Sequence, residues 1–153
     1  MVRHTISRYG YVMMIQGRWW KQFQHRHEQG KMFHSYVKTG RAHPKNTTLI
    51  LFYVAKPVGQ VAGYAEFVEL RVGNALELWA EHGDESALGS KEQYEAFIKD
   101  RERVVFIRFK NLHEATKPVS LSDLLMQLGK RKLARAGFYI DRETAEKLIA
   151  LME

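Results

Sequence analysis

Residues 47–71, TTLILFYVAKPVGQVAGYAEFVELR, contain two runs of strongly β-forming side chains around a short turn. The runs cover residues 48–54 and 60–70, and both are rich in valine, isoleucine, leucine and aromatic residues. Between them, Pro57 fixes the backbone of a turn and Gly59 tolerates a positive φ, so the stretch predicts a β-hairpin. Apolar residues occupy both faces of the second run, which predicts a place in the middle of a sheet.

Gly63 lies in the middle of the second predicted strand. Glycine weakens a strand unless the backbone has to come close to something. A β-bulge, a bend in a barrel or a bound ligand would each explain it.

The remainder of the chain alternates between short strands and short helices. We expect further strands at 9–15, 32–38, 103–110 and 138–140, and helices at 18–28, 75–82, 91–102, 121–128 and 142–152. Ser90, Ser120 and Asp141 are the predicted caps of the last three helices. Turns are predicted at 72–74 and at Lys117-Pro118. The pattern predicts a single α+β domain over residues 1–153, built on a curled mixed sheet or small barrel with short helices around it.

The composition is that of a globular protein. Of 153 residues, 45% are hydrophobic and 27% are charged, which excludes an intrinsically disordered chain. No apolar run approaches the roughly 20 residues of a membrane span, and the first 17 residues lack the pattern of a signal peptide. The absence of cysteine excludes disulfides, thiolate nucleophiles and cysteine-ligated zinc. We therefore expect a cytoplasmic protein that does not contact a membrane.

The net charge of +7 is unevenly distributed along the chain. Residues 1–65 contain ten lysines and arginines and one acidic residue, whereas residues 66–102 contain four lysines and arginines and ten acidic residues. Residues 103–153 are again basic, with ten lysines and arginines and six acidic residues. This polarity predicts a basic face that binds an anion, with the acidic segment elsewhere; the alternative is that the charges mix once the chain folds.

Two stretches together resemble the PUA-like superfamily, which includes the EVE, ASCH and YTH domains. The first is LILFYVAKPVGQVAGYAEFV at 49–68, and the second, at 104–151, contains FKNL, KPVSLSDLL and GFYIDRETAEKLIAL. The strand SYVKTG at 35–40 is closest to an uncharacterised archaeal family of PUA-like proteins. The resemblance implies a pseudo-barrel of mainly antiparallel strands with a cleft that holds a nucleobase or nucleotide of RNA or modified DNA.

Aromatic and basic residues near the implied cleft are the candidates for binding. Exposed aromatic rings stack on single-stranded bases, and lysine and arginine contact phosphates. Trp19 and Trp20 are adjacent on a predicted helix and cannot both face the core, so at least one is expected to pack inside. The predicted nucleic-acid-binding residues are Trp19, Trp20, Tyr36, Lys38, Tyr53, Lys56, Lys130, Arg131, Lys132, Arg135 and Tyr139.

Two alternatives remain open at this point. The first is an ASCH-like nucleotide or nucleoside hydrolase using Lys21 or Lys38 with Glu66, although the region GRWWKQFQHRHEQG departs from the G-x-K-x-x-E pattern of ASCH-like enzymes. The second is a protein-interaction domain without a nucleic-acid ligand. No catalytic residue, metal site or cofactor is predicted, because the chain has no HExxH, P-loop, G-x-S-x-G or G-x-G-x-x-G motif.

Overall fold

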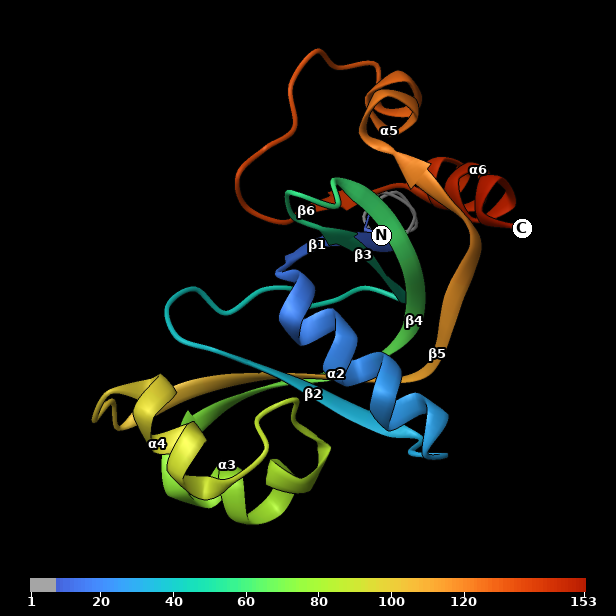
Figure 1. The fold of residues 1–153 in the computed structure, drawn as a ribbon. Coiled ribbons are helices and arrows are strands. Elements are labelled where there is room, and N and C mark those ends of the chain that lie inside the picture. The colour runs from blue at the N-terminus through green and yellow to red at the C-terminus, as the bar shows by residue number, and fades with distance from the viewer. Residues whose placement is uncertain (1–7) are drawn as a thin grey trace.

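The structure is a computed structural model that describes residues 8–153 (Figure 1). The strands are β1 (Gly10–Ile15), β2 (Phe33–Lys38), β3 (Leu49–Val54), β4 (Gln60–Asn74), β5 (Arg103–Ser120) and β6 (Phe138–Ile140). The helices are α2 (Gly17–Glu28), α3 (Ala75–His82), α4 (Lys91–Ile98), α5 (Leu121–Leu128) and α6 (Arg142–Met152), with a 3-10 turn η1 (Gly83–Glu85).

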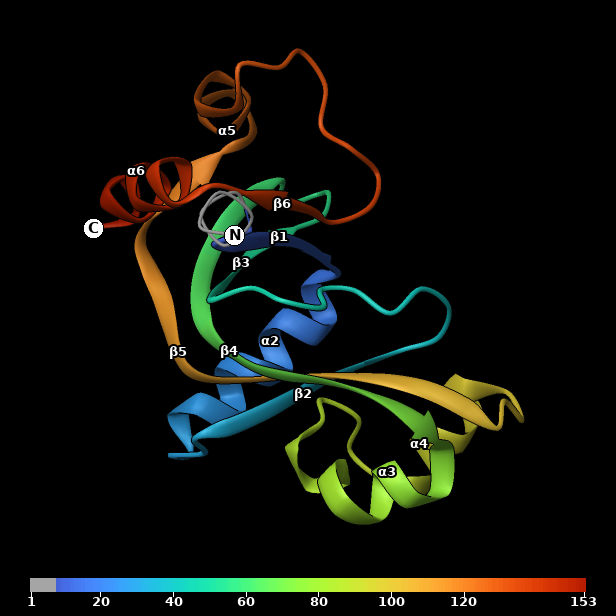
Figure 2. The same ribbon diagram turned by 180° about the vertical axis from the view of Figure 1, so that it is seen from behind.

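All six strands belong to one sheet in the order β2-β5-β4-β3-β1-β6. Only β1 and β3 are parallel; the other neighbouring pairs are antiparallel. The predicted hairpin is confirmed, because β3 and β4 pair antiparallel with Leu49 opposite Glu66. The long strands β4 and β5 bend strongly, so the sheet curls around α2 (Figures 1 and 2). The predicted α+β class and the curled, mainly antiparallel sheet are confirmed.

The central strand β3 separates two hydrophobic cores. Because side chains alternate along a strand, Ile50 and Phe52 face one core while Leu51 and Tyr53 face the other. The first core lies inside the curl against α2, and the second lies outside it against α5 and α6. Burial on both faces explains why this strand is apolar at every position.

Strands β4 and β5 are longer than the sequence predicts. The expected turn at 72–74 is wrong, because β4 continues to Asn74, which pairs with Arg103 on β5. The expected break at Lys117-Pro118 is also wrong, because β5 continues to Ser120. The register shifts between Glu114 and Val119, so Pro118 lies in an irregular part of the ladder where its missing N–H costs little.

The helix caps agree with the sequence, whereas one helix end does not. Ser90, Ser120 and Asp141 each accept a hydrogen bond from the backbone N–H three residues later, at 3.2, 3.1 and 2.8 Å. Helix α4, predicted at 91–102, ends at Ile98, because Lys99 and Asp100 adopt positive φ values of 51° and 63°.

Gly63 is required by close packing against two neighbours. A Cβ at this position would lie 2.8 Å from Cη2 of Trp20 and would collide with the backbone oxygen of His113. The register of the β4–β5 pairing also shifts beside it. Of the three explanations considered, packing at an irregular part of the ladder accounts for this glycine.

The connection between β4 and β5 carries α3, η1 and α4 below the sheet (Figure 1). These elements enclose a third hydrophobic core that includes Leu78, Tyr94 and Phe106. Among the helices of residues 8–153, none is long and apolar enough to cross a membrane.

Candidate functional site

A cleft of about 450 Å³ opens between the two edges of the curled sheet. We call it the basic cleft. Its walls come from β1, β2, the loop 39–47 and the segment 135–137, with Phe97 of α4 at one side. The lining residues are Tyr11, Met13, Met14, Tyr36, Lys38, Thr39, Arg41, His43, Phe97, Ile107, Arg135, Ala136 and Gly137. The volume falls within the range of about 300–1,000 Å³ that is typical of small-ligand sites.

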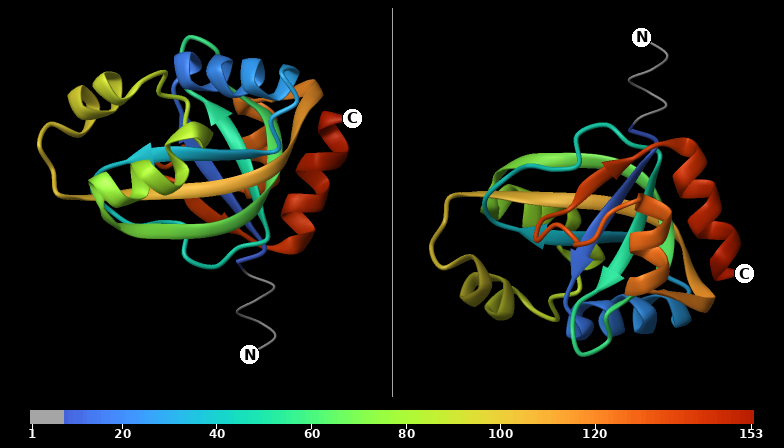
Figure 3. Two further views of the ribbon diagram at one scale, coloured as in Figure 1. Left: turned by 90° about the horizontal axis from the view of Figure 1, so that it is seen from below. Right: turned by 90° about the horizontal axis from the view of Figure 1, so that it is seen from above.

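Strand alternation and sheet topology bring these residues together. Tyr36 and Lys38 are two residues apart on β2 and therefore point to the same face. At the opposite edge of the sheet, β6 pairs antiparallel with β1, with Tyr139 opposite Tyr11. This pairing returns the chain alongside β1, as the red and blue strands of Figure 3 show. Arg135 comes shortly before β6 and lines the same cleft as Lys38, although the two are far apart in sequence.

The lining of the basic cleft is electrostatically one-sided. It contains Lys38, Arg41 and Arg135 but no aspartate or glutamate. Within residues 8–153, none of these three cations forms an ion pair with a carboxylate. Like charges that share a cleft repel one another, so an anion bound there would be stabilised by all three.

Burial shifts the protonation equilibria of three groups in the cleft, raising the pKa of Tyr11 and Tyr36 and lowering that of Lys38. The pKa of Lys38 is lowered because its ammonium group loses contact with water. The pKa of Tyr36 is raised by burial of the phenol, an effect that the nearby Arg18 partly opposes. A phosphate close to Lys38 would favour its charged form and so oppose the effect of burial.

Tyr139 on β6 attaches the loop 39–47 to the edge of the sheet. Its hydroxyl accepts a hydrogen bond of 2.9 Å from the backbone N–H of Lys45, and its ring packs edge-on against Tyr11 at 5.1 Å. Gly137 lies so close to Tyr11 that a Cβ there would collide with the Tyr11 hydroxyl. Tyr139 therefore positions the loop 39–47 and does not line the cleft.

Three of the predicted binding residues line the basic cleft: Tyr36, Lys38 and Arg135. Trp20 does not, because it is only 5% exposed and packs on Phe52 in the inner core. Tyr53 is likewise buried, in the outer core. A base cannot stack on a ring that is this buried, so the function proposed below does not use Trp20 or Tyr53.

The other predicted residues lie outside the basic cleft. Lys56 is exposed on the β3–β4 turn, and Lys130, Arg131 and Lys132 are exposed on the segment after α5. None of these four lines the cleft. Trp19 lines a neighbouring hollow, where it packs edge-on against Phe97.

Sequence reasoning missed several residues of the cleft. Tyr11 and Met13 were assigned only to the strand, and Phe97 only to the apolar stripe of its helix. His43 also lines the cleft, and its buried Nδ1 has no hydrogen-bond partner in the described part of the chain. Spacing could not reveal these residues, because they meet only through the pairing of distant strands.

The Lys38–Glu66 pair of the hydrolase alternative is not assembled at the cleft. Glu66 on β4 lies opposite Lys110, which lies opposite Phe33 at the start of β2. Lys38 is at the other end of β2, five residues away. Glu66 instead accepts a hydrogen bond from Asn111 and does not line the basic cleft.

Comparisons with known proteins place this geometry in a known fold. No family model and no curated protein matches the chain. The crystal structure of ASCH from Zymomonas mobilis matches with a TM-score of 0.75 and 21% identity, over 94% of this chain and 96% of that chain. The chain has an ASCH-like fold.

Two variants of the same Zymomonas mobilis protein match equally well. A serine-to-alanine variant has a TM-score of 0.75 and 20% identity, over 95% of this chain and 97% of that chain. A tyrosine-to-phenylalanine variant has a TM-score of 0.74 and 19% identity, over 94% and 99%. The sequence resembled the PUA-like superfamily, in which ASCH was one of three domains named, and the matches confirm that likeness for the fold, whereas the narrower expectation of an archaeal family has no support.

No metal site accompanies the ASCH-like fold in residues 8–153, since no three histidine or acidic side chains gather closely enough to hold an ion. His25 and His27, two residues apart on α2, point to different sides of the helix.

Proposed function

We propose that this protein binds single-stranded nucleic acid, with RNA as the first candidate, and that the basic cleft holds a nucleotide. The observation that carries the proposal is one cleft lined by three cations and no carboxylate, in which none of the three has an ion pair within residues 8–153. Phosphates match this charge, and the ring of Tyr36 beside Lys38 offers a surface for a base. The ASCH-like fold supports a nucleotide ligand.

Nucleic-acid binding is favoured over the lysine–glutamate hydrolase because Glu66 does not line the cleft, and no other carboxylate is there to pair with Lys38. It is favoured over a protein-interaction role because of where the cations are. Lys38, Arg41 and Arg135 line one concave site without a carboxylate, so they act together and not as separate surface charges. An anionic partner in the cleft would neutralise all three.

Binding of a short single-stranded RNA should depend on salt through the cleft cations. We expect Lys38→Gln and Arg135→Gln each to weaken binding and to reduce the slope of log K against log salt by about 0.7, the value for one lost contact with a single strand. Fluorescence anisotropy between about 50 and 200 mM salt measures both quantities.

Lys117→Gln is the matched control, because Lys117 is exposed on β5 and does not line the cleft. It should leave the slope unchanged. Lys132→Gln tests the basic segment that was predicted from sequence, and we expect a smaller effect than for Arg135→Gln. Wild-type protein that binds neither RNA, single-stranded DNA nor nucleosides at about 50 mM salt would contradict the proposal and favour an interaction domain. Product formation from RNA or nucleosides would favour the hydrolase.

A further inference from the structure

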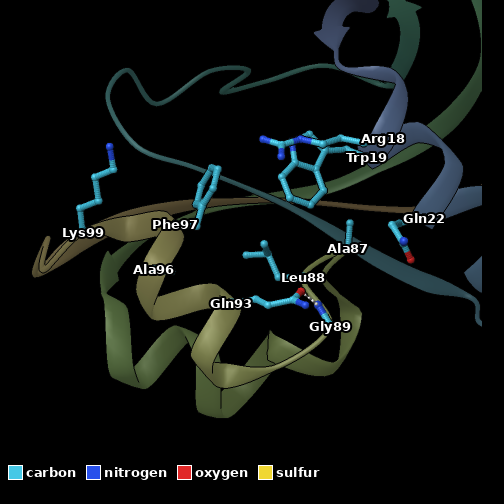
Figure 4. Close-up of a pocket in the computed structure, with 10 residues that line it drawn as sticks. All are labelled: Arg18, Trp19, Gln22, Ala87, Leu88, Gly89, Gln93, Ala96, Phe97 and Lys99. Atoms are coloured by element: carbon cyan, nitrogen blue, oxygen red, sulfur yellow. Dashed lines mark hydrogen bonds between the residues drawn. The ribbon is translucent and has the colours of Figure 1, made fainter.

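A second hollow of about 770 Å³ lies beside the basic cleft, between the start of α2 and the end of α4 (Figure 4). Arg18 and Trp19 come from α2, Phe97 comes from the last turn of α4, and Lys99 is its cap residue. The segment 87–89 closes the lower side in Figure 4. We call this hollow the aromatic hollow.

The aromatic hollow combines three kinds of group that recognise nucleotides. Trp19 and Phe97 supply aromatic rings, which meet edge-on with centroids 6.0 Å apart. The guanidinium of Arg18 lies over the Trp19 ring at 4.4 Å, and guanidinium planes also stack on unpaired bases. Gln93 uses its amide oxygen to accept a 2.8 Å hydrogen bond from the Gly89 N–H, which leaves its NH₂ group for other partners.

Charge in the aromatic hollow follows the pattern of the basic cleft. Arg18 and Lys99 are its charged lining residues, and no carboxylate lines it. Neither cation forms an ion pair with a carboxylate in residues 8–153. An apolar ligand would leave both charges without a partner, whereas a phosphate would contact them.

The two hollows are neighbours that share an aromatic side chain. Phe97 lines both of them. Trp19, Tyr36 and Phe97 also line a small cavity of about 10 Å³, which has room for no more than one water molecule, so the three side chains lie next to one another without an open channel between the hollows. Cations lie on either side of these three side chains, with Lys38 in the basic cleft and Lys99 in the aromatic hollow.

We infer that the aromatic hollow is a second nucleotide subsite, which takes the neighbouring nucleotide of the strand held in the basic cleft. This inference rests on the proposed function and specifies its ligand as an oligonucleotide and not a free nucleotide or base. Alternating aromatic rings and cations are what a single strand requires, since its bases stack while its phosphates need positive charge.

A length series tests the inference directly. Uridine 5′-monophosphate and oligouridylates of two, four and eight nucleotides are titrated against the wild-type protein. We expect the affinity to rise by about five- to 100-fold from the mononucleotide to the tetranucleotide, which is the contribution of one or more stacked bases, and then to level off.

Lys99→Gln changes the aromatic hollow without touching the basic cleft, whereas Arg18→Gln also removes a charge that acts on Tyr36. Lys99→Gln should leave the affinity for the mononucleotide unchanged, and both variants should weaken tetranucleotide binding and lower the salt slope for the tetranucleotide by about 0.7. Lys91→Gln is the matched control: it also removes an exposed lysine from α4, at the end of the helix that does not line the hollow.

The outcomes separate this inference from the proposed function. If the mononucleotide and tetranucleotide bind equally well, the second subsite is wrong and the proposed function stands. If the tetranucleotide binds more tightly but Arg18→Gln and Lys99→Gln behave like Lys91→Gln, the strand leaves the cleft by another route and the inference is again wrong. If no oligouridylate and no mononucleotide binds, both proposals fail.

Discussion

Position 63 has no room for any side chain. Substitution of Gly63 by alanine would force the backbone of His113 or the ring of Trp20 to move. Because Trp20 is packed in the inner core, we expect Gly63→Ala to lower the free energy of unfolding by about 1–3 kcal/mol. Urea denaturation followed by tryptophan fluorescence measures this change.

Gly17→Ala is the matched control for Gly63→Ala. Gly17 begins α2, and a Cβ there would meet its nearest neighbour, Cγ1 of Val54, at an ordinary 3.9 Å. Alanine at this position should be neutral or stabilising by about 0.4–1 kcal/mol. Equal stability of the two variants would show that close packing is not the reason for Gly63.

His34 makes the stability of the fold sensitive to mild acid. It is fully buried, stacked on Phe109 and edge-on to Phe23. Burial, together with the charges of Arg26 and His27, lowers the pKa of His34 to about 4, although Glu85 acts in the opposite direction. Arg26 donates a hydrogen bond of 3.3 Å to Nδ1, which fits a neutral ring.

The sign of this pH effect follows from proton linkage. The unfolded chain binds a proton at His34 below about pH 6.5, whereas the folded protein does so only near pH 4. The contribution of the neutral His34 to the free energy of unfolding is therefore fully present above pH 6.5 and is lost as the pH falls to about 4. We expect this residue to account for about 3 kcal/mol of that loss. Urea unfolding at several pH values measures it.

His34→Phe removes the titrating group and keeps an aromatic ring between Phe23 and Phe109. Its stability should therefore change less between pH 6.5 and 4 than that of the wild type. If the stability of His34→Phe depends on pH in the same way as that of the wild type, other groups cause the acid sensitivity.

At the scale of elements, η1 is attached to the sheet through Glu85. Its carboxylate receives hydrogen bonds from Arg108 on β5, at 2.9 and 3.0 Å, and from Ser35 on β2, at 2.9 Å. Burial would raise the pKa of Glu85, but these hydrogen bonds outweigh it and leave the pKa below its ordinary value. The segment that follows η1 forms one wall of the aromatic hollow.

Glu85→Gln should loosen this attachment. The free energy of unfolding should fall by about 1–3 kcal/mol, because Arg108 loses a charged partner in a partly buried site. The difference from wild type should be largest above the ordinary glutamate pKa and should shrink as the pH falls toward the lower pKa of the folded protein, since the unfolded wild-type chain takes up a proton at this carboxylate first. Urea unfolding at pH 7 and pH 4 measures both effects.

Glu81→Gln is the control for Glu85→Gln, since Glu81 pairs with Arg71 at the surface and is about half exposed. Surface pairs contribute about 0–1 kcal/mol, so this change should have little effect. If both substitutions lower the free energy of unfolding by the same amount, Glu85 is not what attaches η1 to the sheet.

The accuracy of sequence reasoning also differed between elements. Helix caps were predictable because Ser90, Ser120 and Asp141 act on the backbone within three residues. The ends of β4 and β5 were not, because their hydrogen bonds come from each other and override the local turn signals at 72–74 and Pro118.

At the scale of the whole molecule, the fold could be predicted far better than the site. Strands and helices carry local patterns, but the cleft arises where β2 and the segment before β6 approach each other, and no local pattern encodes that meeting. The uneven charge along the chain drew attention to Lys38 and Arg135, which line the cleft, and their binding of a ligand stays a prediction. The charge pattern did not distinguish Arg135 from Lys130, Arg131 and Lys132, because only geometry places one of the four in the cleft.

The pairing of Asn74 with Arg103 has a consequence for how this fold can diversify. The connection that carries α3, η1 and α4 leaves the sheet and re-enters it at two directly adjacent residues, where the Ala75 N–H also bonds to the Glu102 oxygen at 2.8 Å. Adjacent ends place little constraint on the length of the segment between them. Evolution or a protein engineer can therefore exchange this segment, and with it one side of the aromatic hollow, while the strand order stays the same.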